Sequence, residues 1–208
     1  MEPDHSGSIN LIRSYYPNVT LVGNKKTLEM IYGYYGIDDN TLEITDNEAL
    51  SLGRHTLTFH LTPMVHWPET MMTFDETEKV LFSGDAFGCF GTLDGGVLDT
   101  EINLDKYWDE MYRYYANIVG KCGSPVQKAL QKVTSVDIHD QLSRYEGREG
   151  AVIVYGSMYG NTERMAEAIA QGLVRQGIKE VILHNVAKSD ASVILRDIFK
   201  YKGLVIGS

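Results

Sequence analysis

From residue 150 onward the chain alternates strictly between strand-like and helix-like segments, and this alternation constrains the fold more than any other feature. Residues 151–155 form a short apolar strand, and residues 163–175 place their apolar side chains on one helical face before Gly177 ends the helix. The pattern continues as strand, helix and strand over residues 181–186, 189–201 and 204–206. A βαβαβ run of this kind predicts a parallel sheet with right-handed crossovers.

The first part of the chain mixes helices and strands irregularly, which indicates a separate domain. The expected helices cover residues 9–16, 27–35 and 104–119, and another opens at Ser124-Pro125. The expected strands cover residues 19–22 and 57–65, and a hairpin pairs 71–74 with 79–82. We predict a first domain at 1–139, a polar linker at 140–149 and a second domain at 150–208.

Composition excludes several classes of protein. The net charge of −9 argues against a nucleic-acid partner, because a phosphate-binding surface needs a basic excess. Cys89 and Cys122 form no C-x-x-C pair, so neither a disulfide framework nor a zinc knuckle is indicated. No apolar run approaches the roughly 20 residues of a membrane span. We expect a soluble, cytoplasmic protein with neither a membrane nor a nucleic-acid partner.

Candidate metal ligands occur at three places in the first domain. Glu2, Asp4 and His5 form a dense cluster that we expect on a loop, where alternate side chains can turn inward. Alone, such a triplet is more often a solvated acidic end than a site. His66 directly follows a predicted buried strand, however, and Asp85 ends another. Strand ends are where a scaffold presents ligands to a shared cleft, so the three places together favour a metal site.

The order Glu-x-Asp-His, then His66, then Asp85 resembles the metallo-β-lactamase superfamily. Glu2 stands where the hydrolases of that superfamily have a histidine, and this substitution resembles the flavodiiron variant. The gaps of 60 residues between His5 and His66 and of 18 between His66 and Asp85 also match that family. A carboxylate in place of an imidazole hardens the ligand set and favours iron over zinc. The resemblance implies that Glu2 and His66 help hold one iron, that Asp4 and His5 sit on opposite sides of the pair, and that Asp85 bridges both ions.

The sequence departs from the family pattern in two places. The first family histidine would stand immediately before Met1, and the last would fall at Tyr145 or Glu146. His139 is a weak candidate for that last ligand. We therefore expect a chain truncated at both ends, with an internal deletion near residue 139, and an iron pair that lacks one imidazole on each ion.

A glycine-containing loop between the first strand and helix of the second domain is suited to bind a phosphate. Small and hydroxyl residues let backbone amides wrap the anion at a helix N-terminus. The absence of lysine excludes a Walker-type nucleotide loop, although a simple helix cap with a glycine turn remains an alternative. The loop resembles the FMN-phosphate loop of flavodoxins. This resemblance implies side-chain donors and backbone amides from Ser157, Met158, Tyr159, Gly160, Asn161 and Thr162.

Together the two motifs predict an α/β protein: a partial metallo-β-lactamase-like αββα domain followed by a partial flavodoxin-like parallel α/β domain. The flavodiiron resemblance implies reduction of dioxygen to water, or of nitric oxide to nitrous oxide, at two iron ions. FMN would relay electrons from a rubredoxin-like donor within a head-to-tail homodimer, and no catalytic residues are implied beyond the metal ligands. The alternatives are a zinc hydrolase of the metallo-β-lactamase type and a truncated, non-catalytic electron-transfer remnant.

Overall fold

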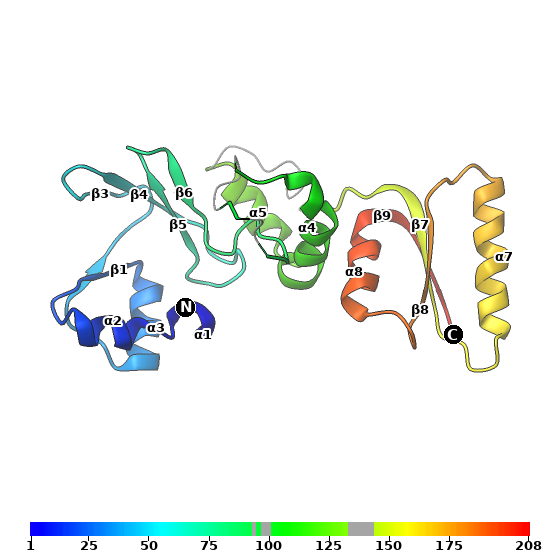
Figure 1. The fold of residues 1–208 in the computed structure, drawn as a ribbon, viewed down its shortest axis with the longest axis horizontal. Helices are drawn as coiled ribbons and strands as arrows, with labels where there is room; N and C mark the ends of the chain where they lie inside the picture. The colour runs from blue at the N-terminus through cyan, green and yellow to red at the C-terminus, as the bar shows by residue number, and fades with distance from the viewer. Residues whose placement is uncertain (93–94, 97–100, 133–143) are drawn as a thin grey trace. The chain divides into compact units, whose positions relative to one another are not determined.

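The computed structural model describes residues 1–92, 95–96, 101–132 and 144–208, and its contacts divide the chain into two compact units (Figure 1). Unit 1 comprises Met1–Ala86 and Lys128–Thr134, and unit 2 comprises Phe87–Gln127 and Ser135–Ser208. The domain boundaries that we predicted come from the sequence pattern, whereas these two units come from contacts. The predicted boundaries therefore stay a prediction. Within the expected linker, Arg148 and Glu149 are the first residues of a strand.

Unit 1 contains helices and two small sheets. Its helices are α1 (Pro3–Ser6), α2 (Ile9–Tyr15) and α3 (Lys25–Tyr35). Strands β1 (Leu21–Gly23) and β2 (Thr41–Glu43) pair in parallel. An antiparallel sheet has the order β3 (Ala49–Ser51), β4 (Thr56–Leu61), β5 (Met71–Asp75) and β6 (Val80–Phe82). The predicted hairpin is therefore confirmed, whereas the sequence pattern did not reveal β2 or β3.

The register of the antiparallel sheet brings two predicted ligands to the same end. Leu61 at the end of β4 pairs with Met71 at the start of β5, so the loop that carries His66 lies at this end. Strand β6 runs back along β5 and pairs Phe82 with Thr73, and the chain therefore returns toward the same end before Asp85. The strand pairing thus brings ligands from two separate loops to the same end of the sheet.

We predicted the N-terminal cluster on a loop, but Asp4 and His5 lie in the one-turn helix α1 and Glu2 is its N-cap residue. Pro3 occupies the start of this helix, where its fixed φ and missing N–H are tolerated. The amides of His5 and Ser6 donate to the Glu2 carbonyl, which closes the turn. Glu2 and His5 are three residues apart, a spacing that puts both side chains on one side of a helical turn.

Unit 2 contains a parallel sheet in the order β8 (Val181–Asn185), β7 (Arg148–Tyr155) and β9 (Tyr201–Gly207). Helix α7 (Asn161–Arg175) joins β7 to β8, and α8 (Ala191–Lys200) joins β8 to β9. The two helices cover opposite faces of the sheet (Figure 1). The predicted βαβαβ arrangement is confirmed, and residues 150–155 of the central strand are all buried.

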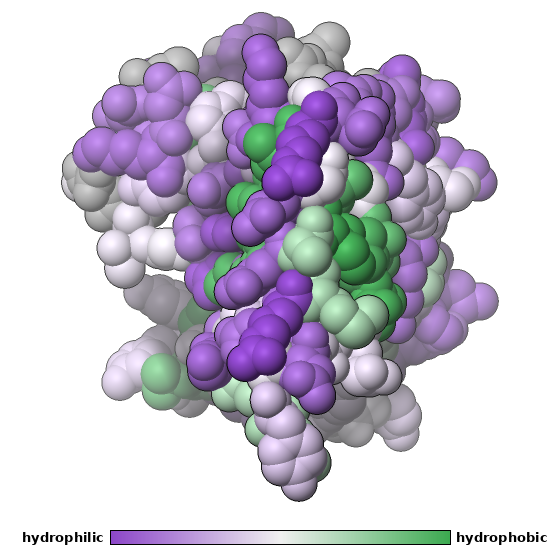
Figure 2. All heavy atoms as spheres, turned by 90° about the vertical axis from the view of Figure 1, so that its right-hand side faces the viewer, coloured by the Kyte–Doolittle hydropathy of each residue, from purple (hydrophilic) through white to green (hydrophobic). Residues whose placement is uncertain are grey.

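Helix α7 is amphipathic. Its inner face packs Ala166, Ala170 and Leu173 against the buried side chains of β7. Figure 2 looks toward the α7 side of the molecule, where hydrophilic residues border a hydrophobic area. On α7 itself, Met165, Ile169 and Val174 are exposed. The helix thus covers the sheet with alanine and leucine and leaves a methionine, an isoleucine and a valine exposed.

The aromatic segment that we predicted as one helix over residues 104–119 is three consecutive helical pieces. These are the 3₁₀ helix η2 (Leu104–Tyr107), α4 (Trp108–Tyr114) and the π-helix η3 (Tyr115–Val119), and α5 (Gly123–Leu130) follows them. Within unit 2 the segment packs on α8. Lys200 Nζ lies 2.7 Å from Asp109 Oδ1, and the Phe199 and Tyr115 rings meet edge to face. Helical structure was correctly predicted, but its subdivision was not.

Candidate metal centre and phosphate loop

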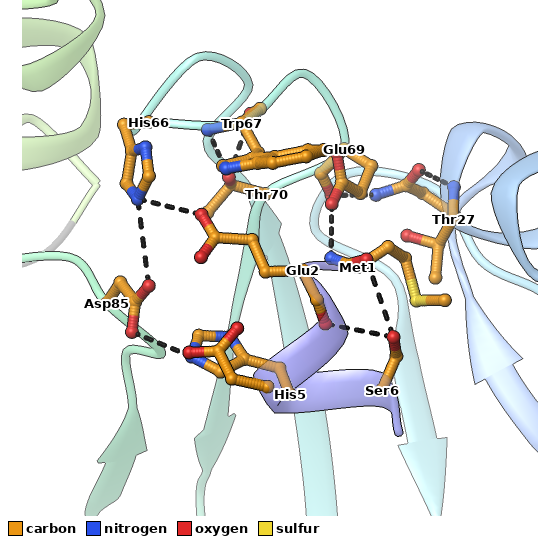
Figure 3. A network of polar contacts seen from close by, with 12 residues as sticks. Met1, Glu2, His5, Ser6, Thr27, His66, Trp67, Glu69, Thr70 and Asp85 are labelled. Carbon is orange, nitrogen blue, oxygen red and sulfur yellow. Dashed lines mark hydrogen bonds and ion pairs between the residues drawn. The ribbon is translucent and has the colours of Figure 1, made fainter. Parts of the chain in front are cut away.

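The structure brings Glu2, His5, His66 and Asp85 together at one place in unit 1 (Figure 3). His66 Nε2 lies 3.1 Å from Glu2 Oε1 and 3.7 Å from Asp85 Oδ2. His5 Nε2 lies 3.2 Å from the other carboxylate oxygen of Asp85. Ligand atoms of Glu2, His5 and Asp85 all lie within 4.8 Å of one another. Four of the five side chains selected from the sequence therefore converge.

Asp4, the fifth predicted ligand, lies at the solvent side of this cluster. Its side chain is 70% exposed, and its carboxylate is 3.4 Å from His5 Nε2. The structure thus places Asp4 beside His5 and not with the three ligand atoms that share the tightest grouping. Its predicted place next to the metal pair remains a prediction.

Helix α1 is held in place by the buried hydroxyl of Ser6. Ser6 Oγ donates to the Glu2 carbonyl at 2.9 Å and lies 2.8 Å from the Tyr35 hydroxyl at the end of α3. Ser6 is 2% exposed. A short helical turn has little stability of its own, so these two contacts fix the direction in which Glu2 and His5 point.

The loop that presents His66 is closed by its own hydrogen bonds. The Thr62 amide donates to the Thr70 carbonyl at 2.9 Å, and the Met64 amide donates to the Trp67 carbonyl at 2.7 Å. Met64 has a φ of 66°, a left-handed conformation that is rare for a residue with a side chain. Such strain persists only where the surrounding structure determines it, and it is common at functional sites.

Asp85 stands between two residues with positive φ. Gly84 has a φ of 61°, which glycine adopts without steric cost, and Phe87 has a φ of 64°. The chain therefore turns sharply on both sides of Asp85. This local geometry turns the carboxylate toward His5 and His66 instead of letting the strand continue.

A cavity of about 200 Å³ lies beside the four converging side chains. Trp67 forms part of its wall, together with Val65 and Met71. Glu2 and His66 are mostly shielded from solvent, at 20% and 19% exposure. The donor set of two carboxylates and two imidazoles contains no thiolate, and hard oxygen donors with imidazoles suit iron. The residues present fit a metal centre of the expected kind.

The other histidines of unit 1 have separate partners. His55 Nδ1 lies 2.7 Å from Asp75 Oδ2, and His60 Nδ1 lies 3.1 Å from Asn47 Oδ1. Burial tends to raise the pKa of Asp75, but hydrogen bonds from the Thr77 amide and the His55 ring outweigh this and hold its pKa below the usual value. His139, the weak candidate ligand, lies outside the described residues.

Sequence reasoning missed the residues that support the site. Asn24 caps α3 by accepting from the Thr27 amide at 3.0 Å, and its side-chain amide donates to the Glu69 carbonyl at 2.7 Å. Glu69 is 4% exposed and lines the cavity. One signal in the sequence could have pointed to Glu69, because it is a carboxylate three residues after His66 in an otherwise uncharged stretch. A carboxylate that is buried normally needs a hydrogen-bonding partner.

In unit 2 the predicted phosphate-loop residues, all except Gly160, line one open cavity. It has a volume of about 600 Å³ and is bordered by Gly156, Ser157, Met158, Tyr159, Asn161, Thr162 and Ser208. Ser157 Oγ accepts from the Gly160 amide at 3.0 Å. Gly160 precedes the first residue of α7 with a φ of 81°. The loop also follows the central strand, where connections to the two neighbouring strands diverge, and ligands bind at such points of parallel sheets.

The side chains of Met158 and Tyr159 are both 86% exposed. Neither residue is packed into the core, so this part of the loop is open to solvent. Helix α7 is 15 residues long, so its N-terminal amides carry the partial positive charge that favours an anion. The geometry fits a phosphate group, and the role of each loop residue stays a prediction.

Comparison with known families assigns both parts of the chain. Residues 1–142 match the family described as ODP family beta lactamase, and residues 153–208 match flavodoxin. None of the helices in the described residues has the length and apolar character that crossing a membrane requires.

Curated relatives align over the entire chain. An uncharacterised protein of Methanocaldococcus jannaschii is 31% identical, and the match covers 58% of its length. A nitric oxide reductase of Moorella thermoacetica is 27% identical, with 57% of its length covered. The first alignment extends over 230 positions, more than the 208 residues of this chain, so that relative carries residues with no counterpart here. The chain spans about half the length of the curated relatives it matches.

Solved structures support the same assignment. The rubredoxin oxygen:oxidoreductase of Desulfovibrio gigas superposes with a TM-score of 0.88 at 23% identity, covering 98% of this chain and 57% of that one. The flavodiiron protein of Giardia intestinalis superposes with a TM-score of 0.83 at 26% identity, covering 91% and 52%. The predicted fold class, metallo-β-lactamase-like followed by flavodoxin-like, is confirmed. The chain belongs to the ODP family of β-lactamase-like proteins with a flavodoxin segment fused to it, and its resemblance to the flavodiiron proteins is confirmed.

Proposed function

We propose that this chain carries the metal centre and the FMN-phosphate loop of an oxidoreductase that reduces nitric oxide to nitrous oxide, dioxygen to water, or both. The first reaction converts two nitric oxide molecules, two electrons and two protons into nitrous oxide and water. The second converts dioxygen, four electrons and four protons into two water molecules. The observation that carries the proposal is the convergence of Glu2, His5, His66 and Asp85 on one cavity.

The cofactors that the family implies are two iron ions and FMN. Iron would supply an electron-rich centre that binds the diatomic substrate, and FMN would supply the electrons. Glu2, Asp4, His5, His66 and Asp85 are the proposed metal ligands. The Asp85 carboxylate has one oxygen toward each of the two imidazoles, His5 and His66, which suits a bridging role.

The chain's own residues also shape the environment of the reaction. The cavity beside the ligands has a volume of about 200 Å³, and part of its wall is apolar, formed by Val65, Trp67 and Met71. A small, partly apolar space of this kind admits diatomic molecules. The nitric oxide reductase of Moorella thermoacetica, 27% identical, supports nitric oxide as a substrate.

In unit 2 the proposed FMN-phosphate contacts come from Ser157, Asn161 and Thr162 side chains and from the Met158, Tyr159 and Gly160 amides. The cavity that all of these residues except Gly160 border supports the proposal. We further propose a rubredoxin-like electron donor, a head-to-tail homodimer and a cytoplasmic location. These three features rest on the family resemblance.

The test combines cofactor analysis with gas measurements. The protein, produced with iron and FMN and without added zinc, is expected to contain iron and to show flavin absorbance. Under anaerobic conditions with a reduced rubredoxin it is expected to consume nitric oxide and release half as much nitrous oxide. Zinc in place of iron, with hydrolysis of a β-lactam or thioester and no gas turnover, would show a zinc hydrolase instead. Absence of both metal and turnover would show a non-catalytic remnant.

A further inference from the structure

Helix α7 follows the phosphate loop directly and carries a glutamate in its first turn. Its N-cap residue is Gly160, which has no side chain to accept hydrogen bonds from the first-turn amides, and Glu163 is the third helical residue. The amides of a first helical turn have no partner within the helix, so an anion can take them. The start of α7 therefore faces two anions, the proposed phosphate group and the Glu163 carboxylate.

A glutamate at the third helical position can turn back toward the amide of the N-cap residue and cap the helix. Here the N-cap amide, that of Gly160, donates to Ser157 Oγ at 3.0 Å, and it is one of the amides that we propose for the phosphate. If Glu163 turned back, its carboxylate and the phosphate would compete for the same partial positive charge and would repel each other. Phosphate binding therefore depends on where the Glu163 side chain is held.

The structure holds the Glu163 side chain by a contact to the sheet. The Tyr155 hydroxyl donates to Glu163 Oε1 at 3.0 Å. Tyr155 is the last residue of β7, is 6% exposed and belongs to the same buried cluster as Ala166 of α7. Burial raises the pKa of the Tyr155 hydroxyl, and the hydrogen bond to the Glu163 carboxylate raises this pKa as well, so the hydroxyl keeps its proton at neutral pH. Tyr155 is therefore a fixed donor for Glu163.

We propose that Tyr155 is a positioning residue of the phosphate loop, whose hydroxyl holds the Glu163 carboxylate away from the first-turn amides of α7 and so leaves these amides to the phosphate group. The inference rests on the proposed FMN-phosphate site and goes beyond it, because neither Tyr155 nor Glu163 lines the cavity or is a proposed phosphate contact. FMN affinity then depends on a competing anion within the chain as well as on the donors of the loop.

The test measures the FMN affinity of the full chain by fluorescence titration, with inorganic phosphate as a competitor that reports on the loop itself. Tyr155→Phe removes the hydroxyl and keeps the ring, so the Glu163 side chain can turn toward the start of the helix. We expect the affinities for FMN and for inorganic phosphate to fall about 3- to 5-fold, the size of a charge effect at a helix terminus.

Removing the competing anion is expected to reverse this loss. Glu163→Ala should bind FMN at least as tightly as the wild type does, because a negative charge beside the phosphate is removed. The double variant Tyr155→Phe/Glu163→Ala should bind FMN as tightly as Glu163→Ala does. If Tyr155 only supported the packing of β7, the double variant would bind no better than Tyr155→Phe.

Tyr201→Phe is the matched control. The Tyr201 hydroxyl also donates to a glutamate of unit 2, because it lies 3.3 Å from Glu180 Oε2. Tyr201 is the first residue of β9 and pairs with Arg148 at the start of β7, whereas Tyr155 is the last residue of β7. This separation along the strand is roughly 20 Å. The control is expected to leave FMN affinity and phosphate competition unchanged.

The outcomes separate this inference from the proposed function. If phosphate competes with FMN for the wild type but Tyr155→Phe binds FMN with equal affinity, the positioning role is wrong and the phosphate site stands. The same holds if the double variant stays as weak as Tyr155→Phe, or if Tyr201→Phe weakens binding as much. If the wild type binds no FMN, or binds FMN that inorganic phosphate does not displace, both the phosphate site and the positioning role are overturned.

Discussion

The metal centre and the phosphate loop are built in opposite ways. The metal centre gathers Glu2 and His5 from the N-cap and body of α1, His66 from the loop between β4 and β5, and Asp85 from the segment after β6. The phosphate loop consists of contiguous residues between one strand and one helix. A contiguous site depends on local backbone conformation, whereas a composite site depends on strand register and on residues that tie its segments together. We therefore expect the phosphate loop to lose its ligand when its backbone is strained. We expect the metal centre to lose its metal when a ligand that serves both ions is removed.

The largest effect is expected at the composite site. Asp85→Ala removes the carboxylate that lies within 4 Å of both His5 and His66, and we expect iron content to fall to near zero because a bridging ligand serves two ions. Iron is measured per chain on protein loaded anaerobically. His139→Ala is the comparison variant and is expected to keep most of its iron. The reverse result, with metal lost from His139→Ala and kept by Asp85→Ala, contradicts the ligand assignment.

The contiguous site is expected to respond to backbone strain. Gly160 has a φ of 81°, so Gly160→Val forces a branched side chain into the left-handed region at a cost of about 1–3 kcal/mol. We expect FMN affinity, measured by fluorescence titration, to fall about 10-fold or more, since 1.4 kcal/mol corresponds to a factor of ten.

Gly172→Ala is the control for this variant. Gly172 lies within α7, where an added methyl group meets no other atom within 4 Å. The change is expected to stabilise the protein by up to about 1 kcal/mol and to leave FMN affinity unchanged. Equal loss of FMN affinity in both glycine variants would mean that helix α7 as a whole, and not the loop backbone, determines binding.

A smaller effect is expected on the stability of unit 2, without an effect on its phosphate loop. Asp190 caps α8 by accepting from the Ser192 amide at 2.8 Å. Asp190→Ala is expected to lower the free energy of unfolding by about 1 kcal/mol. FMN affinity should not change, because α8 lies on the opposite face of the sheet from α7 (Figure 1). Chemical denaturation and FMN titration of the same sample check the two statements, and a parallel fall in both would show that the loop is not locally determined.

The smallest effect concerns acid stability in unit 1. The pKa of Asp75 lies below its usual value, so the folded chain keeps this carboxylate ionised where the unfolded chain takes up a proton. Its contribution to stability is full above about pH 4 and is lost as the pH falls through the folded-state pKa. We expect Asp75→Asn to lose less stability than the wild type over that acid range, as measured by urea unfolding at several pH values. Gly172→Ala alters no ionisable group and should keep the wild-type slope.

The same contrast explains what could be predicted from the sequence. The phosphate loop and the βαβαβ run were predictable because each signal is local: an apolar strand, a glycine turn and an amphipathic helix follow one another. The ligands were predictable only through their spacing, since no local pattern says that His66 and Asp85 end at the same side of a sheet. Helix α1 was missed because four residues are too few for a helical period. Glu69 and Asn24 were missed because their roles exist only after distant segments have packed.

One segment of unit 1 lies far along the sequence from the rest of that unit. Lys132, more than forty residues beyond Asp85, donates to Asp46 at 2.7 Å and to the carbonyl of Leu61, the last residue of β4. During synthesis the ribosome must therefore translate η2, α4, η3 and α5 before this contact can form. All five proposed ligands leave the ribosome earlier than Lys132 does. A laboratory fragment ending after Asp85 would lack the same contact.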